Sequence, residues 1–576
     1  MKKFPLLAVF FAITLKVFGA DFYVASVPQG AGDGSSAANA IAVNSLNLGS
    51  LVPGDTLHLV GILTNSIRLT TSGTAANPIT VHFEPGAKLS LPNGELIVMN
   101  NLSYVVIDGG LNGVIQNTAT GTGLTYSNAA TFIDASGSSS CTFKNLLFQN
   151  QYIHTSTNDA YPDIAASGAI YANGLGGSNY IISDTFSNIG WCVSILATPS
   201  FLLVTNCAFF NYDHGVVPGG TNIVIVGNHF DTAANWDTVA NAYHHDPIHF
   251  FGANPTNVAS FIIAGNIFTN NLGNNNTAMI YLETAPPNVL LYNNLFLQYP
   301  SNYLNDGMVV AMGKNTQVLN NTFAGTVGTY NSSGLVTGTA GTVVANNLFN
   351  SLDNYVYVQT GAGLVFSNNI YANHAAGGNS PWATKGGSFG TFSAWQAAVG
   401  DANSFYTNAV VVNANGTLPL SSPAVGAGAN LSGLFTTDFS GTGRLSIGAW
   451  VVGAVSGIIG SQPTVSGAPV ISVTPIGQII GVISVGAMTN EVFMVSNTGG
   501  GTLSGNASVG APYNIVSGGS YNLSAGQSQT VIVSYHPTTV GASIQLLTFG
   551  GGAGTNITLN GTAVMPPPQN LQPHVP

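Results

Sequence analysis

The sequence predicts an all-β fold, a parallel β-helix, and the prediction rests on a repeated phrase and on the short strands before it. Between residues 184 and 371 a polar residue, usually Asn, stands two positions before Phe or Tyr, as in Asn266-Ile-Phe268 and Asn294-Leu-Phe296. The copies recur at intervals of 22 to 38 residues, which is typical of solenoid coils that carry loops of variable length. Runs rich in Ile and Val precede the copies, without a competing helical period.

Each position of the phrase has an expected role in a coil. The aromatic ring points inward and stacks on the ring of the next coil. The Asn occupies a bend, where it adopts left-handed backbone geometry and bonds through its amide to the Asn one coil away. Asn206-Cys207-Ala208-Phe209 is a degenerate copy that we align on Asn206.

The first residues indicate export. Residues 1–20 have the pattern of a signal peptide: two Lys residues, an apolar run, then Gly19-Ala20. No later run is long and apolar enough to span a bilayer. We therefore expect a monomer that is secreted or attached to the cell surface. The three cysteines are expected to be small buried core residues, with a Cys192–Cys207 bridge as the alternative.

The charge balance narrows the class of partner. Only 5% of the residues are charged, and the net charge is −11. An acidic chain of this kind is unsuited to nucleic acid and to anionic membrane surfaces. A polyanionic substrate is also disfavoured unless calcium mediates its binding. A polysaccharide or a surface glycan is the partner that these observations leave.

Two sets of phrases carry a resemblance to a known superfamily. Asp21-Phe-Tyr-Val24 and Tyr104-Val-Val-Ile-Asp-Gly109 begin the region, and Ile447-Gly-Ala-Trp450 closes it. Residues 21–452 thereby resemble the secreted right-handed parallel β-helix proteins of the pectate-lyase-like superfamily. The resemblance implies a right-handed β-helix. It implies no single activity, because this superfamily holds lyases, hydrolases, epimerases and non-catalytic surface proteins.

The composition changes after the β-helix. Residues 453–467 are rich in Gly, Ser and Ala and are expected to form a linker. Residues 468–565 contain several short strands with turn residues between them, which predicts a small β-sandwich. Asn497-Thr-Gly-Gly-Gly-Thr-Leu503 and His536-Pro-Thr538 resemble the immunoglobulin-like module called choice-of-anchor D, which implies a non-catalytic accessory role. The Pro-rich tail, residues 566–576, resembles a linker into a further module.

Aligning the coils backward from the repeated phrase gives two expected rows in the preceding strand. The inward row is Ala172, Ser194, Val216, Leu282, Val309 and Leu335, and the outward row is Tyr171, Val193, Gly215, Tyr281, Met308 and Gly334. The same alignment places His249, Glu283 and Asp213 outward and His214 inward, as a core histidine. Because coils stack about 4.8 Å apart, His249, Tyr281 and Glu283 should lie on two adjacent rungs.

Two long intervals, residues 145–184 and 228–266, are expected to form walls beside this outward row. Aromatic residues on such walls suit the faces of sugars, and the phrase His244-His245-Asp246-Pro-Ile-His249 supplies polar groups. The predicted substrate-binding residues are Tyr281, His245, Trp236, Tyr243, Asp213 and Tyr171.

The candidate chemistry follows from the charges of this region. No Lys or Arg lies between Lys144 and Lys314, so the basic residue that many lyases of this superfamily use is absent there. Two carboxylates about 5–9 Å apart serve glycoside hydrolysis. We therefore expect Glu283 and Asp246 to act as acid and base or nucleophile, and His249 to orient a sugar hydroxyl. The paired-aspartate, Gly-His-Gly and Arg-x-Lys motifs of polygalacturonase-like hydrolases are not present.

No metal is expected in this site, although the sequence leaves two alternatives open. Their ligand sets are Asp231, Asp237 and Asp246 for calcium, and His244, His245 and His249 for zinc.

Two functions remain at this point. The first is an exported carbohydrate-active protein that binds a polysaccharide and, if it is an enzyme, acts as a glycoside hydrolase or lyase. The second is a non-catalytic surface or adhesion protein in which the β-helix is a stalk. Crowding of aromatic and acidic residues on one face favours the first, and the lack of a complete catalytic motif favours the second.

Overall fold

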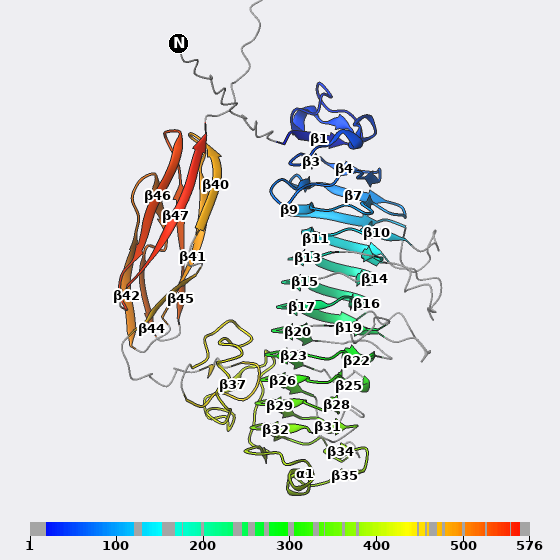
Figure 1. The fold of residues 1–576 in the computed structure, drawn as a ribbon, viewed down its shortest axis with the longest axis vertical. Coiled ribbons are helices and arrows are strands. Elements are labelled where there is room, and N and C mark those ends of the chain that lie inside the picture. The colour runs from blue at the N-terminus through cyan, green and yellow to red at the C-terminus, as the bar shows by residue number, and fades with distance from the viewer. Residues whose placement is uncertain are drawn as a thin grey trace, which may run out of the picture. The chain divides into compact units, whose positions relative to one another are not determined.

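The computed structural model divides into two compact units, which are described separately (Figure 1). The first is Met1–Ser432 with Asp438–Ser440 and Leu445–Ser456, and the second is Gly433–Thr437 with Gly441–Arg444 and Gly457–Pro576. The structure describes residues 19–119, 130–151, 168–174, 177–196, 201–233, 245–251, 258, 260–269, 276–297, 304–325, 333–338, 340–359, 363–375, 380–445, 448–455, 458–459, 469–474, 478–497, 501–524, 527–552 and 554–564. The expected signal peptide, most of the expected linker and the Pro-rich tail lie outside these residues.

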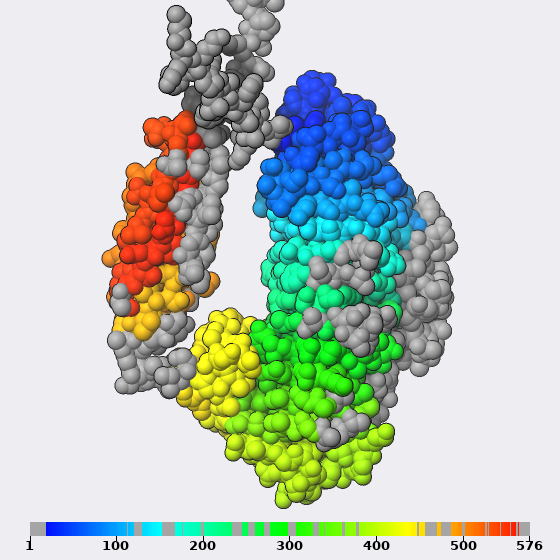
Figure 2. Space-filling view, viewed as in Figure 1, coloured from blue at the N-terminus to red at the C-terminus, as the bar shows by residue number. Residues whose placement is uncertain are grey.

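The first unit is the predicted parallel β-helix. Its strands form three rows, here called rows A, B and C, and each row pairs in parallel from one coil to the next. Figure 2 shows the coils stacked in chain order from blue to light green. Four long strands bend from one row into the next: β9 (Val105–Asn117) and β11 (Cys141–Gln151) run through rows A and B, and β14 (Thr185–Ile195) and β16 (Ala208–Pro218) run through rows B and C.

The remaining strands belong to single rows. Row A contains β1 (Asp21–Ala25), β3 (Thr56–Leu59), β6 (Ile79–Phe83), β13 (Asn179–Ile182), β15 (Leu202–Thr205), β17 (Asn222–Val226), β20 (Ser260–Ala264), β23 (Val289–Tyr292), β26 (Gln317–Leu319), β29 (Val343–Ala345) and β32 (Val365–Ser367). Row B contains β4 (Ile62–Leu63), β7 (Lys88–Leu91), β18 (His229–Ala233), β21 (Ile267–Thr269), β24 (Leu295–Leu297), β27 (Thr322–Ala324), β30 (Leu348–Asn350), β33 (Ile370–Ala372) and β36 (Phe405–Thr407). Row C contains β5 (Ile67–Arg68), β8 (Ile97–Val98), β10 (Thr131–Asp134), β12 (Gly168–Ala172), β19 (Asp246–Phe250), β22 (Asn276–Leu282), β25 (Leu304–Ala311), β28 (Ser333–Thr337), β31 (Asn354–Val358) and β34 (Trp382–Thr384).

A column of aromatic rings fills the core beside row B, as the sequence predicts. The stacked residues are Phe148, Phe186, Phe209, Phe230, Phe268, Phe296, Phe323, Phe349 and Tyr371. Their ring centroids lie 4.5 to 5.3 Å apart, and the rings are nearly parallel. All are fully buried. Each ring thus covers its neighbour on the next coil, which is the contact that the fixed position of Phe in the phrase requires.

A buried ladder of Asn side chains runs along the corner between rows A and B. Each amide nitrogen donates to the amide oxygen of the next coil at 3.0 to 3.1 Å, through Asn228, Asn266, Asn294, Asn321, Asn347 and Asn369. The predicted amide bonding is confirmed, but the predicted left-handed backbone is one residue out of place. The left-handed residue is the one before each ladder Asn, such as Gly227 or Asn293. Asn206 is itself left-handed, so Cys207, not Asn206, occupies the ladder position.

Row C departs from strict alternation, and this departure positions the candidate site. Two consecutive residues face the core in each coil: Cys192 with Val193 and Met308 with Val309 are fully buried members of it. A Cβ on Gly215 would lie 2.8 Å from the Phe230 ring, so Gly215 also faces inward. The residues before and after such a pair therefore both face outward.

The two predicted rows are corrected accordingly. Val193, Met308 and Gly215 face inward rather than outward, and Gly334 does so too, because its Cβ would touch Phe349. Ser194 is paired with Tyr171 and lies in the outward row instead of the inward one. The other inward residues, Ala172, Val216, Leu282, Val309 and Leu335, are confirmed in the core.

Beyond the last coils, the first unit ends in less regular structure. β35 (Gly387–Phe389) pairs antiparallel with β34. α1 (Phe392–Val399) begins after Thr391, whose hydroxyl accepts the Ala394 N–H, and ends at Gly400 in left-handed conformation. The three cysteines are free and buried, as expected, and the alternative Cys192–Cys207 bridge is not formed. Short elements of this unit outside the three rows are β2 (Ile41–Ala42), β37 (Leu418–Pro419) and the 3₁₀ helices Ala37–Asn39, Val43–Ser45 and Leu48–Ser50. The short strand β38 (Ile458–Ile459) belongs to the second unit.

The second unit is the predicted small β-sandwich. One sheet has the order β39 (Ile471–Thr474), β41 (Thr489–Asn497), β45 (Ser528–Tyr535) and β43 (Tyr513–Ser517). The other has the order β40 (Gln478–Ser484), β47 (Thr555–Val564), β46 (Gly541–Phe549), β42 (Thr502–Ser508) and β44 (Ser520–Ser524). Side chains from both sheets form a separate core that includes Phe493, Val531 and Leu547. Among the described residues of the chain, no helix is long and apolar enough to cross a membrane.

Candidate functional site

Three successive coils of row C bring histidines and carboxylates together on the outer side of the β-helix. Asp213 and His214 lie on β16, Asp246 and His249 lie on β19, and Glu283 follows β22 directly. His214 is paired with Asp246, and His249 is paired with Tyr281 on the next coil. The outward positions of row C therefore gather titratable side chains from residues 213 to 283 into one cluster.

Asp213 forms the buried base of this cluster. Its carboxylate accepts the Trp191 indole N–H at 3.1 Å and lies 2.6 Å from His214 Nδ1, and it also contacts His245 Nδ1. Burial opposes the ionisation of this carboxyl group. The charges and hydrogen bonds of His214 and His245 outweigh that effect and hold the pKa of Asp213 well below its usual value. Asp213 is therefore an anion that fixes two imidazoles.

A hydrogen-bonded line leads from Asp213 to the surface. His214 Nε2 lies 3.1 Å from His249 Nδ1, and the two rings stack with their centroids 5.2 Å apart. On the other side of its ring, His249 Nε2 lies 3.1 Å from Glu283 Oε2. The side chain of His249 is only 5% exposed, whereas that of Glu283 is 48% exposed. Glu283 is thus the end of the line that solvent can reach.

Asp246 is a second buried carboxylate beside the two imidazoles. Its Oδ1 accepts the Ala278 N–H at 2.9 Å, and its Oδ2 lies 3.5 Å from His249 Nδ1 and 3.9 Å from His214 Nε2. Burial raises the pKa of Asp246 to about 7, although His214 and the Ala278 N–H act in the opposite direction. The two carboxylates, Asp246 and Glu283, thus lie on opposite nitrogens of the same imidazole.

Aromatic side chains border the line of polar groups. The ring of His249 lies 4.8 Å from Phe251 and 5.0 Å from Tyr281. Trp191 packs against His214 with ring centroids 4.9 Å apart. Phe251 and Tyr281 are partly exposed, so apolar ring surface lies beside His249, the hydrogen-bond partner of the exposed Glu283 carboxylate. This combination of a ring face and a hydrogen-bonding group suits a sugar.

The structure places most of the predicted site residues in one cluster, with two corrections. His249, Tyr281 and Glu283 lie on adjacent rungs, as predicted. His214 was assigned to the core and is instead a central member of the cluster, because two consecutive inward residues follow it. Asp213, expected to present its side chain outward to a ligand, is fully buried.

The other predicted binding residues differ in position. His245 is fully buried against Asp213. Tyr171 lies in the outward row of β12, three coils before His249 and therefore about 14 Å away along the solenoid. Trp236 and Tyr243 lie outside the described residues, as do residues 152–167 and 234–244 of the two expected walls. The same holds for Asp237 of the calcium set and His244 of the zinc set.

Sequence reasoning missed Trp191 and His214, although one signal pointed to them. Asp213-His214 and His245-Asp246 are adjacent acidic–histidine pairs on consecutive coils. In the correct register, His214 stands directly over Asp246 and Trp191 stands directly over His214. Aligning these two dipeptides would have placed His214 over Asp246, and Trp191 occupies the same position one coil earlier.

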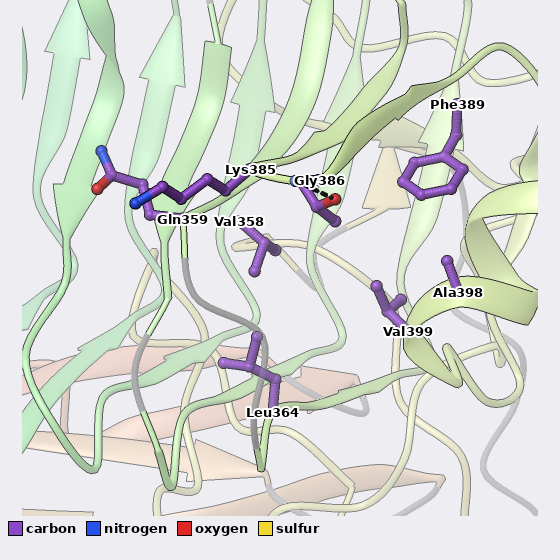
Figure 3. A pocket seen from close by; sticks show the side chains of 9 residues that line it. Val358, Gln359, Leu364, Lys385, Gly386, Phe389, Ala398 and Val399 are labelled. Atoms are coloured by element: carbon purple, nitrogen blue, oxygen red, sulfur yellow. Dashed lines mark hydrogen bonds between the residues drawn. The ribbon is translucent and has the colours of Figure 1, made fainter.

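A cavity elsewhere in the β-helix lacks comparable chemistry. It has a volume of about 320 Å³ and is lined by Val358, Gln359, Leu364, Thr384, Lys385, Gly386, Phe389, Ala398 and Val399. Figure 3 shows apolar side chains around much of this cavity, with Lys385 and Gln359 extending together at one side. No carboxylate, histidine or thiol is among its lining residues, so we take the row C cluster as the candidate functional site.

Sequence comparison identifies no relative of this chain: no family of known proteins matches it, and no curated protein does. Solved structures similar to it include pectate lyase Pel9A, with 14% identity, 76% of this chain and 96% of the lyase covered, and a TM-score of 0.37. The match to a lacto-N-biosidase from Eubacterium ramulus covers 68% of this chain and 67% of the biosidase chain, with 11% identity and a TM-score of 0.36. A mutant tailspike of E. coli bacteriophage HK620 with a bound pentasaccharide has 12% identity, 88% and 86% coverage, and a TM-score of 0.29. These are distant likenesses to carbohydrate-active β-helix proteins, and they bear on the fold alone.

Proposed function

We propose that the protein is exported, binds a glycan on the outer face of row C and cleaves it with Glu283 as the acid or base that meets the sugar. The position of Glu283 carries this proposal. Its carboxylate is the exposed end of a hydrogen-bonded line of buried groups, and partly exposed aromatic rings lie beside His249, its partner in that line. A carboxylate held in this way can give or take a proton at a glycosidic oxygen or a sugar hydroxyl.

The surroundings of Glu283 argue against an ordinary surface carboxylate. No Lys or Arg occurs in the sequence between Lys144 and Lys314, so these coils supply no cation for a surface ion pair. His249 holds one oxygen of Glu283, and His214 and Asp213 in turn hold His249. In the proposal, these three are positioning residues, and Glu283 is the catalytic residue.

The expected substrate is a neutral glycan. The net charge of −11 disfavours a polyanion, and ring surfaces such as Tyr281 favour the apolar face of a sugar. Residues 1–20 have the pattern of an export signal, which agrees with a substrate outside the cell. The sandwich, which resembles choice-of-anchor D, is proposed as a non-catalytic accessory module.

Turnover on a panel of neutral oligosaccharides and polysaccharides tests this proposal. Release of reducing ends would report hydrolysis, and ultraviolet absorbance of unsaturated products would report elimination. Loss of the acid or base in Glu283→Gln is expected to lower kcat by about 100- to 10,000-fold with little change in glycan affinity. Glu95→Gln is the matched control, because Glu95 is an exposed glutamate on a distant coil. Equal activity of Glu283→Gln and wild type would refute the catalytic role.

A second function, the non-catalytic surface protein, has one observation in its favour. Asp213, His214 and Asp246 are at most 1% exposed, and a buried polar network can simply hold neighbouring coils in register. This function predicts no turnover on any glycan. It also predicts that Glu283→Gln and Glu95→Gln have the same glycan affinity as wild type.

A further inference from the structure

Three potential metal ligands converge within the row C cluster. His214 Nε2, His249 Nδ1 and Asp246 Oδ2 all lie within 4.8 Å of one another, and each belongs to a buried side chain. Two imidazole nitrogens and one carboxylate oxygen are the donor set of many zinc sites and of other divalent transition-metal sites. This arrangement of ligand atoms does not depend on the proposed contact between Glu283 and a glycan.

The separations of these atoms match those around a metal ion. His214 Nε2 and His249 Nδ1 are 3.1 Å apart, and Asp246 Oδ2 is 3.5 Å from the latter and 3.9 Å from the former. In a tetrahedral zinc site with bonds of about 2.0–2.1 Å, neighbouring ligand atoms are about 3.3 Å apart. The three atoms therefore outline one face of such a tetrahedron with only small displacements.

The second polar atom of each ligand side chain, the one that faces away from the other ligands, has a hydrogen-bond partner, as is usual for metal ligands. His214 turns its other nitrogen, Nδ1, to the Asp213 carboxylate at 2.6 Å, and His249 turns its Nε2 to the Glu283 carboxylate at 3.1 Å. The second oxygen of Asp246 is fixed by the Ala278 N–H. Metal-ligating histidines commonly donate their remaining N–H to a carboxylate, which fixes the ring and its tautomer.

The three ligand atoms face one common point. In its metal-ligating form each imidazole presents a lone pair at the facing nitrogen, His214 Nε2 or His249 Nδ1, and Asp246 Oδ2 adds a carboxylate oxygen beside them. A cation at this point would take the place of the hydrogen bond that joins the two rings in its absence.

We propose that His214, His249 and Asp246 bind one divalent transition-metal ion of the zinc class. Asp213 and Glu283 would act as the carboxylates that orient the two imidazoles. Three protein ligands leave a fourth position for water or a substrate atom, which is the arrangement of catalytic rather than structural zinc sites. The proposal does not depend on glycan cleavage and would stand if no glycan were turned over.

Metal uptake by the untagged full-length protein tests the proposal. The protein would be stripped with a chelator and titrated calorimetrically with Zn²⁺, and in parallel with Co²⁺ as a spectroscopic probe. One ion per chain is expected, with the visible absorption of four- or five-coordinate Co²⁺ and no sulfur-to-cobalt charge transfer. Asp246→Asn is expected to weaken Zn²⁺ binding by about 100-fold or more, and Asp213→Asn by about 10- to 100-fold.

His229→Gln is the matched control, because its imidazole bonds to Thr269 on row B, away from the three ligands. It should bind Zn²⁺ like wild type. Circular dichroism and thermal unfolding of every stripped variant would show whether weaker binding comes from unfolding, and His214→Gln supplies a second test if Asp246→Asn does not fold. No uptake by wild type would overturn the proposal, as would uptake unchanged in both ligand variants. Sulfur charge transfer would also overturn it, since it would place the ion on a cysteine.

Discussion

Among the described residues of the β-helix, two clusters combine histidines with carboxylates, and the difference between them separates surface stabilisation from chemistry. In the first coils, His58 lies between Asp21 and Glu84, with carboxylates on both ring nitrogens at 3.2 and 2.7 Å. Nearby, Lys144 pairs with Asp108 at 3.0 Å. In the row C cluster, the carboxylates lie on the outer sides of two imidazoles, and the imidazoles face each other.

Burial makes the same residue types behave differently in the two places. The His58 side chain is 15% exposed and its partner Asp21 is 64% exposed, so water and salt screen the pair. Asp213 and His214 are shielded almost completely, and their interaction is strong and costly to break. A cluster on a solenoid surface therefore indicates a site only when its groups are buried and arranged around a common point.

The largest expected effect comes from removing the buried anion. Asp213→Asn should lower the free energy of unfolding by about 3–5 kcal/mol, because two imidazoles and the Trp191 N–H lose their charged partner. Denaturant unfolding of chelator-treated protein would measure this. A loss below about 1 kcal/mol would mean that the buried cluster contributes no more than an exposed one.

Replacing a buried carboxylate that has no histidine partner should raise, not lower, the free energy of unfolding. Asp184 stands at the ladder position of its coil, where it accepts the Leu146 N–H, and burial raises its pKa well above the usual value. Its Oδ2 has no hydrogen-bond partner among the described residues. The folded protein holds the Asp184 proton more tightly than the unfolded chain does. The protonated carboxyl therefore contributes its full stabilisation of the folded state below the unfolded pKa of about 3.9, and this contribution is lost as pH rises through the folded pKa.

Asp184→Asn should therefore stabilise the protein at pH 7, by about 1–3 kcal/mol, while having little effect near pH 3. Unfolding curves across that pH range would measure the difference. A variant that is less stable than wild type at pH 7 would show that the ionised carboxylate is needed there.

The smallest effect is expected in the partly exposed cluster around His58. His58→Gln should change the free energy of unfolding by less than about 1 kcal/mol, and added salt should reduce even that difference. The same denaturant assay, at low and high salt, is sufficient. A salt-independent loss of several kcal/mol would place this cluster in the same class as Asp213.

The sequence predicts the β-helix and its internal ladders well because both depend on one repeated phrase. A Phe at a fixed position must stack on its equivalent, as Phe230 does on Phe268. The bend was displaced by one residue, since the left-handed conformation falls on Gly227 or Asn293, before the ladder Asn. Asn suits both positions, so residue type alone does not distinguish them.

The site was predicted less completely because strict alternation fails in row C. The neighbours Cys192 and Val193 both face the core. The residues before such a pair therefore face outward where strict alternation predicts that they face the core, and His214 lies beside His249. The burial of Asp213 and His245 also escapes a strand-by-strand alignment, because it depends on packing across coils. The alignment did predict that Glu283 lies on the coil next to His249 and that its side chain is exposed.

The Asn ladder has a direction, and this has a consequence for how such a protein can change its length. The amide oxygen of each internal Asn accepts from the coil before it, and its amide N–H donates to the coil after it, as Asn294 does between Asn266 and Asn321. Each internal rung therefore receives two N–H groups from the coil before, one from the backbone and one from the amide, and donates the same two to the coil after. Duplicating or deleting a whole coil preserves this pairing, whereas inserting or deleting part of a coil would move an Asn out of the ladder position. A β-helix of this kind can therefore lengthen or shorten by whole coils without loss of its Asn ladder.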